Sequence, residues 1–401
     1  MTVAIDYEEL AGWLRLQLTD GIGNASARKL LTAFGLPEQL FKQRTSALRE
    51  VVNAAQAQAL SQEPLGFAEA LNTTWAWLQT DPDCRRVLPL GDPAYPSSLL
   101  QMEDPPVLLY GVGHAGAWQS GHLDALRCVA VVGSRNPTPQ GAANAHEFGQ
   151  ALALAGLTIV SGMALGVDGA AHQGALDALG ALGAIGTAGK LPQEHTATIA
   201  VVGTGLDRVY PKQHLSLAKR IAVHGLILSE YPLGTPPLAA HFPQRNRIIS
   251  GLSQGTLVVE AALKSGSLIT ARLALDQGRE VFAIPGSIHS TQSRGCHALI
   301  KQGAKLVESA QDVLEELFAT PPRPDSASKA HAADPRCELE DVPDGPHGLL
   351  EALGFDPSSL DALQARTGLD TPRLQAELMA LELQGDVLRL PGGLFQRQVR
   401  S

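Results

Sequence analysis

The feature that most constrains the fold is an alternation of short apolar runs with helical stretches between residues 127 and 310. The runs are rich in β-branched residues and apolar at nearly every position, as strands are when helices cover both faces of a parallel sheet. The stretches between them are about 10–18 residues long and apolar at helical spacing. This pattern predicts an α/β fold with an extended Rossmann-like, doubly wound and mostly parallel sheet. The expected strands are Cys128–Val132, Leu157–Ser161, Thr198–Val202, Leu226–Ser229, Thr256–Val259, Glu280–Ala283 and Lys305–Val307.

The regions before and after this pattern lack the alternation of strands and helices. Residues 1–80 have helical spacing without β-branched runs, and Gly21-Ile22-Gly23 forms a short turn signal between two helices. Such a turn can offer backbone N–H groups to a phosphate, but its acidic surroundings favour a plain turn. Residues 319–347 hold six prolines, which indicates a linker.

The C-terminal part has the pattern of a winged helix. Leu349–Leu353, Ser359–Thr367 and Pro372–Gln384 have helical spacing, and two short apolar runs follow them. The third helix would be the DNA-reading one, but it is poor in cations, so we favour a protein-contact or autoregulatory role. The predicted domains are a helical domain of helix-hairpin-helix or SAM-like type (1–80), an extended lead-in (81–126), the Rossmann-like domain (127–318), the linker (319–347) and the winged helix (348–401).

Charge is distributed unevenly along the chain. The net charge is −9, from 31 basic and 40 acidic residues, but residues 127–310 alone carry +5. The flanking residues 1–126 and 311–401 carry −6 and −8. A polyanion would therefore be drawn to the middle of the chain. Aromatic residues make up only 4% of the sequence, which argues against a sheet that stacks bases on a row of rings.

Glycines and polar residues follow the predicted strands at their carboxyl ends, where open α/β sheets bind ligands. Glycine lets the backbone approach a ligand closely, and each following helix offers unpaired N–H groups. Four cations in these loops add full positive charge, so the set suits phosphates, singly or in a row. The candidate contact residues are Gly133, Ser134, Arg135, Gly162, Gly166, Gly203, Thr204, Gly205, Lys212, Arg245, Asn246, Arg247 and Ser267.

The sequence contains none of the common enzyme motifs. Gly203-x-Gly205 has Arg208 where a dinucleotide fingerprint needs its third glycine, and there is no GxxxxGK[ST] P-loop. The 12 histidines form no HExxH and the four cysteines form no CxxC, so we expect neither a metal nor a cofactor. No nucleophile–base pair has a recognisable spacing, so no catalytic residue is expected. Asp168 is interpreted as the cap of a helix Gly169–Leu179.

Three features of the sequence bear on the cellular compartment: its longest uncharged stretch, its N-terminus and its cysteines. Phe148–Val167 has no charged residue, but Gly156 and Gly162 break it, so we expect no membrane span. The N-terminus has neither a basic head nor an apolar core of a signal peptide. Widely separated cysteines fit a reducing cytosol, and we expect a cytoplasmic protein.

Seven motifs follow one another through residues 127–310. They are VVGSR (Val131–Arg135), SGMALGVDGAAH (Ser161–His172), TIAVVGTGLDRVYPK (Thr198–Lys212), SEYP (Ser229–Pro232), HFPQRNRIISGLS (His241–Ser253), SGSLITARLALDQGREVFAIPG (Ser265–Gly286) and GCHALIKQGAKLV (Gly295–Val307). Together they closely resemble the DNA-processing protein A family, also called DprA or Smf. Each piece alone is short, but the ordered combination is highly specific.

The resemblance implies a non-enzymatic recombination mediator. Such a protein binds single-stranded DNA without sequence specificity, protects it, and helps to load the RecA recombinase in natural transformation and in repair. The Arg of GSR falls on Arg135 and the Lys of YPK on Lys212. The Arg-Asn-Arg of FPxRNR falls on Arg245, Asn246 and Arg247. The resemblance also implies a homodimer through the Rossmann-like domain, with RecA and single-strand-binding protein as partners.

One segment departs from the family, and two other functions stay open. Gly180–Ala197 is an insertion, for which a surface loop is favoured over a longer DNA path through Lys190. The rival function is a Rossmann-like nucleotide phosphoribohydrolase, whose PGGxGTxxE motif places a catalytic glutamate. Here Gly251–Glu260 lacks the proline and first glycine pair, and Glu260 falls one residue late, which would turn it to the opposite face of a strand. A protein scaffold whose winged helix binds a partner is the third class.

Overall fold

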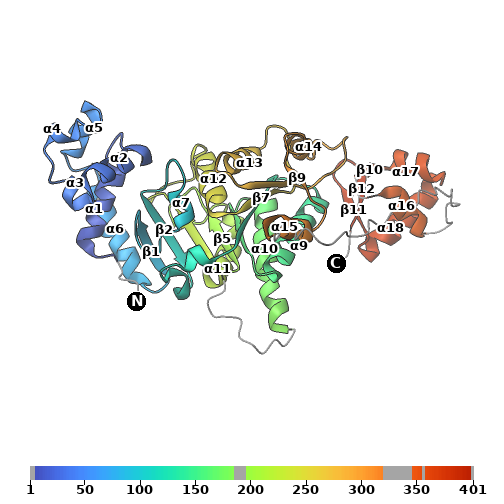
Figure 1. Cartoon of the computed structure of the whole chain (residues 1–401). Helices are drawn as coiled ribbons and strands as arrows, with labels where there is room; N and C mark the ends of the chain where they lie inside the picture. Colours follow the sequence, from blue (N-terminus) through green and yellow to red (C-terminus); the bar gives the residue numbers. More distant parts are fainter. Residues whose placement is uncertain (1–4, 185–195, 319–345, 355–356, 399–401) are drawn as a thin grey trace, which may run out of the picture.

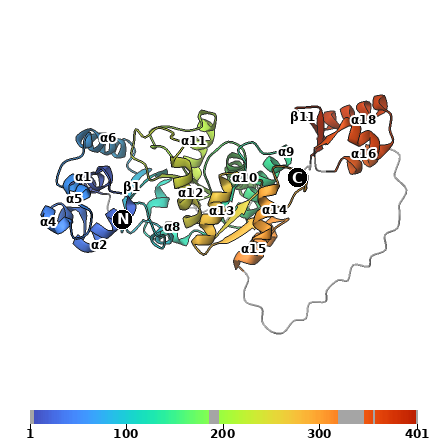
Figure 2. The same ribbon diagram turned by 90° about the horizontal axis from the view of Figure 1, so that it is seen from above.

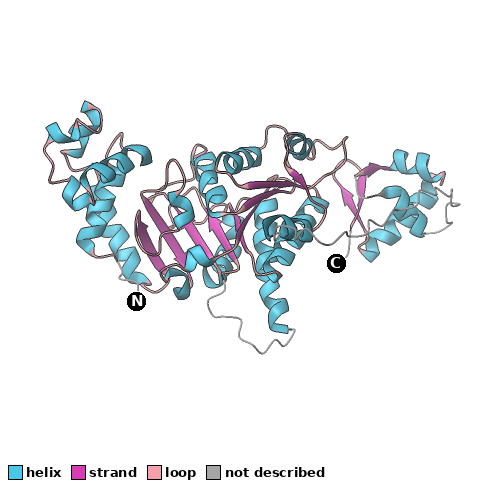
Figure 3. Ribbon diagram, viewed as in Figure 1, coloured by secondary structure: helices cyan, strands magenta, loops and turns pink. Residues whose placement is uncertain are grey.

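The computed structural model describes residues 5–184, 196–318, 346–354 and 357–398. These residues build a central nine-stranded sheet in the order β1-β2-β6-β5-β4-β3-β7-β8-β9 (Figures 1 and 3). The strands are β1 (Arg85–Pro89), β2 (Leu108–Gly113), β3 (Cys128–Val132), β4 (Thr158–Ser161), β5 (Thr198–Val201), β6 (Leu226–Ser229), β7 (Gly255–Val258), β8 (Glu280–Ala283) and β9 (Lys305–Leu306).

The seven predicted strands are confirmed, each within one residue of its predicted bounds. Strands β3 to β9 run parallel to one another, and Val129 of β3 lies opposite both Ile159 of β4 and Gly255 of β7. Successive side chains of a strand point to opposite faces. Ala130 therefore joins the core on one face of the sheet and Val131 the core on the other, which explains why β3 is apolar throughout.

The prediction that residues 81–126 form an extended lead-in is wrong. This segment supplies β1 and β2, which pair antiparallel with each other, while β2 pairs antiparallel with β6. Its prolines flank the strands and leave them intact. Pro89 ends β1, an edge strand where a missing N–H is tolerated, and Pro105 and Pro106 precede β2.

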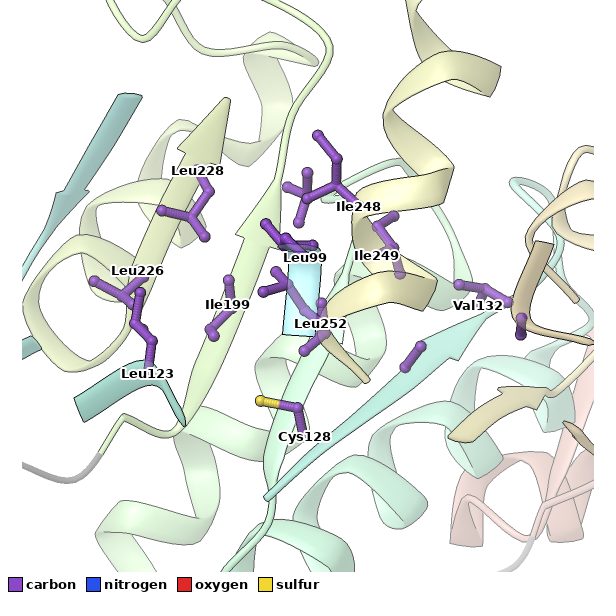
Figure 4. Packing of buried hydrophobic residues seen from close by; sticks show 14 of the residues in the cluster. Leu99, Leu123, Cys128, Val132, Ile199, Leu226, Leu228, Ile248, Ile249 and Leu252 are labelled. Carbon is purple, nitrogen blue, oxygen red and sulfur yellow. The ribbon is translucent and has the colours of Figure 1, made fainter. Parts of the chain in front are cut away.

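Helices cover both faces of the sheet, as a doubly wound layer requires. α7, α8, α12, α13 and α14 pack on one face, in the cluster of buried side chains that Figure 4 shows. α9, α10, α11 and α15 pack on the other face. The bounds are α7 (Ser97–Leu100), η1 (Ala115–Trp118), α8 (His122–Ala125), α9 (Pro139–Leu154), α10 (Val167–Ala184), η2 (Lys212–His214), α11 (Leu215–His224), α12 (His241–Leu252), α13 (Ser267–Asp276), α14 (Arg294–Lys301) and α15 (Ala310–Phe318).

The N-terminal region is helical, as predicted, and packs on the β1–β2 edge of the sheet. Its helices share one core with strand residues such as Leu108 and Tyr110. Gln17 Nε2 donates to the backbone carbonyl of Glu230 (2.9 Å), and Asn24 Nδ2 donates to its carboxylate (3.3 Å). These contacts hold the α1–α2 turn against the sheet. The helices are α1 (Tyr7–Leu18), α2 (Asn24–Phe34), α3 (Pro37–Leu40), α4 (Thr45–Leu48), α5 (Ala54–Leu60) and α6 (Phe67–Thr80).

The C-terminal unit is a winged helix, which confirms the sequence prediction. Its three helices enclose a small core of its own around Leu363, Leu374 and Leu378. Its strands form a sheet of order β10-β12-β11. The elements are α16 (Pro346–Leu353), β10 (Ser358–Ser359), α17 (Leu360–Thr367), α18 (Thr371–Gln384), β11 (Val387–Leu390) and β12 (Leu394–Arg397).

Two predicted segments fall at the limits of the described residues. The insertion begins as helix, because α10 continues to Ala184, and residues 185–195 lie outside the described residues. Most of the predicted linker, residues 319–345, also lies outside them. Within the described ranges, no helix combines the length and apolar character needed to cross a membrane.

Candidate nucleic-acid interface

An open cleft of about 720 Å³ lies at the carboxyl ends of the central parallel strands. The loop after β3 supplies Ser134 and Arg135, and the loop after β7 supplies Lys264. Tyr210 enters from the loop after β5, and Phe242 from the first turn of α12. Segments far apart in the sequence thus meet at one edge of the sheet, which is where the topology of a doubly wound fold places a ligand site.

A cation and two rings form a row along this cleft. The Arg135 guanidinium carbon lies 5.3 Å from the centroid of the Phe242 ring, a cation–π contact. The rings of Tyr210 and Phe242 are 5.6 Å apart between centroids, and Tyr210 is 46% exposed. Arg135 and Lys264 are exposed as well. Ring faces accept stacked bases, while the two cations are available to phosphates.

Two helices begin at the cleft. α12 starts at His241 and α13 at Ser267, and neither has a side-chain hydrogen bond at its N-cap. The first N–H groups of a helix lack intrahelical partners and carry the positive end of the helix dipole. These helix ends add to the positive potential that Arg135 and Lys264 create.

The structure brings together about half of the predicted contact residues. Six line the cleft: Gly133, Ser134, Arg135, Arg245, Asn246 and Ser267. The other seven do not line it in the described part of the chain: Gly162, Gly166, Gly203, Thr204, Gly205, Lys212 and Arg247. Lys212 is exposed on the short helix η2, two residues after Tyr210. The backbone at Thr204 is used internally, because its carbonyl accepts a hydrogen bond from Ser229 Oγ (2.7 Å).

Arg245 lies at the cleft but its charge is used inside the protein. The side chain is only 4% exposed, and Nη1 donates to the carbonyls of Gly162 (2.6 Å) and Val201. Nη2 lies 3.9 Å from Asp168 Oδ2. Burial lowers the pKa of Arg245 to about 10, opposed by the carboxylate of Asp168. The structure shows that this arginine ties the ends of β4 and β5 to α12, and its contact with a phosphate stays a prediction.

Arg247 does not line the cleft, although it belongs to the same predicted set of contacts. Residues two apart on a helix point about 200° apart, so Arg247 faces away from the cleft that Arg245 lines. It is buried, forms an ion pair with Glu230, and its Nε lies 3.2 Å from Asp104 Oδ2. Burial raises the pKa of Glu230, and Arg247 opposes that shift. Because Glu230 also binds Asn24, this ion pair anchors the N-terminal helices.

Two of the predicted glycines serve internal packing. A Cβ atom on Gly162 would collide with the Arg245 guanidinium. Gly166 has φ +80°, a conformation that other residues rarely adopt, and its Cβ would meet the Ser134 carbonyl. These glycines therefore make room for Arg245 and for the loop after β3, and their place in the motif does not need a ligand to explain it.

The carboxylates near the sheet edge also have structural partners. Asp168 is the second residue of α10 and does not cap it, contrary to the prediction. Its Oδ2 accepts from the Ala164 N–H (3.3 Å), and burial raises its pKa against the opposing charge of Arg245. Glu260 accepts from both the N–H (2.9 Å) and the hydroxyl (2.6 Å) of Thr138, the N-cap of α9. That role is structural and differs from the free glutamate that a phosphoribohydrolase needs.

The cleft residues that the predicted set left out include Tyr210, Phe242 and Lys264, which carry its rings and its second exposed cation. Each was visible beside a residue already singled out, since Tyr210 stands in YPK, Phe242 in FPQRNR, and Lys264 before SGS. The low aromatic content hid Tyr210 and Phe242, because a fraction of the whole chain does not reveal where the few rings gather. In the described ranges, no group of three or more His, Cys, Asp or Glu side chains is arranged to hold a metal ion.

Fold and site together define a Rossmann-like protein whose strand ends form an open, basic, ring-bearing cleft. A family model described as DNA recombination-mediator protein A matches residues 86–318, and one described as DprA winged helix domain matches residues 319–393. The chain therefore belongs to the DNA recombination-mediator protein A family. The members of this family are described as mediators of DNA recombination.

Similar proteins agree with this assignment. Protein Smf of Escherichia coli is 40% identical over 327 residues, 81% of this chain and 80% of that one. Protein Smf of Synechocystis is 34% identical over 97% of this chain and 99% of its own. The X-ray structure of DNA processing protein A from Streptococcus pneumoniae covers 78% of this chain and 99% of its own, with 38% identity and a TM-score of 0.59.

Proposed function

We propose that this protein binds single-stranded DNA along the cleft without sequence preference and acts there as a recombination mediator. The observation that carries the proposal is the row of Arg135, Phe242 and Tyr210, with Lys264 lining the same cleft. Every base has a face that stacks on a ring, so such a surface tolerates any sequence. Phosphates of the same strand meet the two exposed cations.

A single strand fits this surface better than a duplex does. In a duplex the bases are stacked on one another and are not free to lie on the rings, so a duplex would reach the cleft with its phosphates alone. Lys212, exposed two residues beyond Tyr210, extends the line of cations in our proposal. Gly203, Thr204 and Gly205 belong to the same segment after β5 and are proposed contacts as well.

The wider role follows from family membership and the sequence motifs. We propose that the protein protects the bound strand and helps to load the RecA recombinase onto it, in natural transformation and in repair. A homodimer through the Rossmann-like domain would place two clefts on one strand, and linked sites gain affinity from their high effective concentration. Single-strand-binding protein is the further proposed partner, and the cytoplasm the proposed compartment.

A salt-titrated binding comparison tests the proposal. Fluorescence anisotropy with a labelled thymidine oligomer and with a duplex of equal length should give tighter binding of the single strand at every salt concentration. Equal or tighter binding of the duplex would overturn it. A nucleoside monophosphate incubated beside these samples should stay intact, and release of its free base would favour the phosphoribohydrolase.

A further inference from the structure

Asn246 lies on the side of α12 that forms one wall of the main cleft. Phe242, Arg245, Asn246 and Ile249 all line this cleft, and their spacing of three and four residues places them on one side of the helix. Figure 2 shows α12 beside α13, which packs against it and lines the same cleft with Thr270. Asn246 therefore stands in the cleft wall one turn of helix beyond the Phe242 ring.

The buried side chain of Arg245 fixes the orientation of the Asn246 amide. Arg245 Nε donates to Asn246 Oδ1 at 3.0 Å. A guanidinium has donors only, and burial lowers the pKa of Arg245 to no less than about 10, so the group stays charged at neutral pH. The amide atom that faces Nε must therefore be the oxygen. A free asparagine can present either end of its amide to a ligand, but this one would lose its bond to Arg245 by turning over.

The amide nitrogen of Asn246 is the atom left for a ligand. Asn246 is half-buried, and among the residues that the structure describes its Nδ2 has no hydrogen-bond partner. Arg245 is itself held in place, because Nη1 donates to the carbonyls of Gly162 and Val201 and Nη2 lies near Asp168. Asn246 thus offers two N–H donors to the cleft, with its oxygen turned to a side chain that cannot move freely.

Two fixed donors suit the acceptor atoms of a nucleic-acid strand. Phosphate oxygens only accept hydrogen bonds, and every base carries carbonyl oxygens or ring nitrogens that accept them. An amide turned the other way would point its oxygen at these atoms and repel them. A donor that is already oriented also loses less conformational freedom when it binds, so more of the bond energy appears as affinity.

We propose that Arg245 is a positioning residue for Asn246, and that the amide nitrogen of Asn246 donates to an acceptor atom of the bound strand, on a phosphate or on a base edge. The inference rests on the proposed function, because it needs a strand in the main cleft. It gives the buried Arg245 a part in binding that acts through its neighbour and does not require it to touch the strand.

Binding of a labelled thymidine oligomer to variants of the full chain tests the role of Asn246. Asn246→Leu removes the donors and should weaken binding about 10-fold, the contribution of one hydrogen bond. Asn246→Asp keeps an oxygen for Arg245 but turns a charged oxygen to the strand, and should weaken binding about 100-fold. Asn144→Leu is the matched control, because Asn144 Oδ1 also accepts a bond (from Gln140 Nε2, 2.7 Å) but does not line the cleft. The control should bind like the natural chain, and Asn246→Asp binding as tightly as Asn246→Leu would overturn the inference.

An abasic oligomer of the same length, measured at low salt, identifies the acceptor. If Asn246 donates to a base, Asn246→Leu should weaken binding of the thymidine oligomer alone. If it donates to a phosphate, the same variant should weaken binding of both oligomers equally. Either result agrees with the proposal and assigns the acceptor, whereas Asn246→Leu without effect on both oligomers contradicts it.

Arg245→Lys tests the positioning itself. The lysine ammonium can still reach the buried carbonyls, but lysine has no donor at the place of Nε. This change should weaken binding about 3- to 10-fold, and cause no further loss in a chain that already carries Asn246→Leu, because both changes remove the same bond. A further loss in the double variant would show a purely structural arginine and refute the positioning. If urea unfolding shows that Arg245→Lys does not fold, Asn246→Asp decides, since it leaves Arg245 in place. Failure of the proposed function would show differently, as Arg135→Ala without effect on binding.

Discussion

Replacing Arg135 by alanine removes one cation of the cleft with little other disturbance. Arg135 is exposed, and its guanidinium rests on the Phe242 ring at 5.3 Å, so the change leaves the buried core intact. A hydrogen bond to a charged group contributes about 1.5–3 kcal/mol. Loss of one such bond to a phosphate predicts binding of single-stranded DNA weaker by about 10- to 150-fold.

Salt dependence gives the sharper measurement. Each phosphate neutralised on a single strand contributes about 0.7 to the slope of log K against log salt concentration. Arg135→Ala should reduce that slope by about 0.7. The difference in affinity between the natural chain and the variant should then shrink about 2.6-fold between 50 and 200 mM salt. A stacking or folding defect would leave the slope unchanged.

The assay is fluorescence anisotropy with a labelled thymidine oligomer over a series of salt concentrations. Arg220→Ala is the matched control, because Arg220 lies on α11, is paired with Asp177 at 2.9 Å, and does not line the cleft. It changes the net charge of the protein by the same amount, so its slope should equal that of the natural chain. An unchanged slope for Arg135→Ala, or an equal decrease for both variants, would refute the placement of the strand.

Three further predictions concern the ring, the buried ion pair and a buried histidine. Phe242→Ala should weaken binding about 5- to 150-fold, because stacking of a base contributes about 1–3 kcal/mol, while the salt slope stays constant in the same titration. Glu230→Ala removes one of the two carboxylates that pair with buried Arg247 and leaves Asp104. It should lower the free energy of unfolding in urea, by less than the about 3–5 kcal/mol that a buried charge left with no partner costs, and Glu230→Leu combined with Arg247→Met should recover most of that loss. Burial lowers the pKa of His172 from 6.5 to about 3, so below pH 6.5 the unfolded chain binds a proton that the folded chain does not. From pH 7 to 5.5 the natural chain should lose about 1 kcal/mol more stability than His172→Asn, and identical pH profiles would contradict this.

Strands β3 to β9 of the central sheet were predictable from the sequence, whereas β1 and β2 were not. Runs such as Cys128–Val132 are apolar on both faces. This pattern is typical of parallel strands, because helices cover both faces of a parallel sheet. β1 and β2 were missed because prolines crowd the segment around them, and a proline at the end of an edge strand looks the same in sequence as one in a loop. Pairing with β6, more than 100 residues further on, makes β2 a strand.

The cleft was predictable in position but less so in composition. Glycine-rich loops after each strand pointed to the edge of the sheet at which the cleft lies, and Arg135 lines that cleft. Tyr210, in the loop after β5, and Phe242, in the first turn of α12, are 32 residues apart, and only the fold brings their ring centroids to within 5.6 Å. A motif therefore indicates where a site lies, while contacts between loops decide which side chains form its surface.

The sequence by itself determined the layered α/β architecture, the winged helix and the edge at which the cleft lies, because these depend on the local period of apolar residues and on strand-to-helix order. Only the tertiary structure decided which cations are free to act. Arg245 and Arg247 belong to one short motif, yet the first is bonded to Gly162 and the second to Asp104, 83 and 143 residues away. Burial and pairing are set by neighbours distant in the chain, so the charge of a side chain can be predicted locally but its availability cannot.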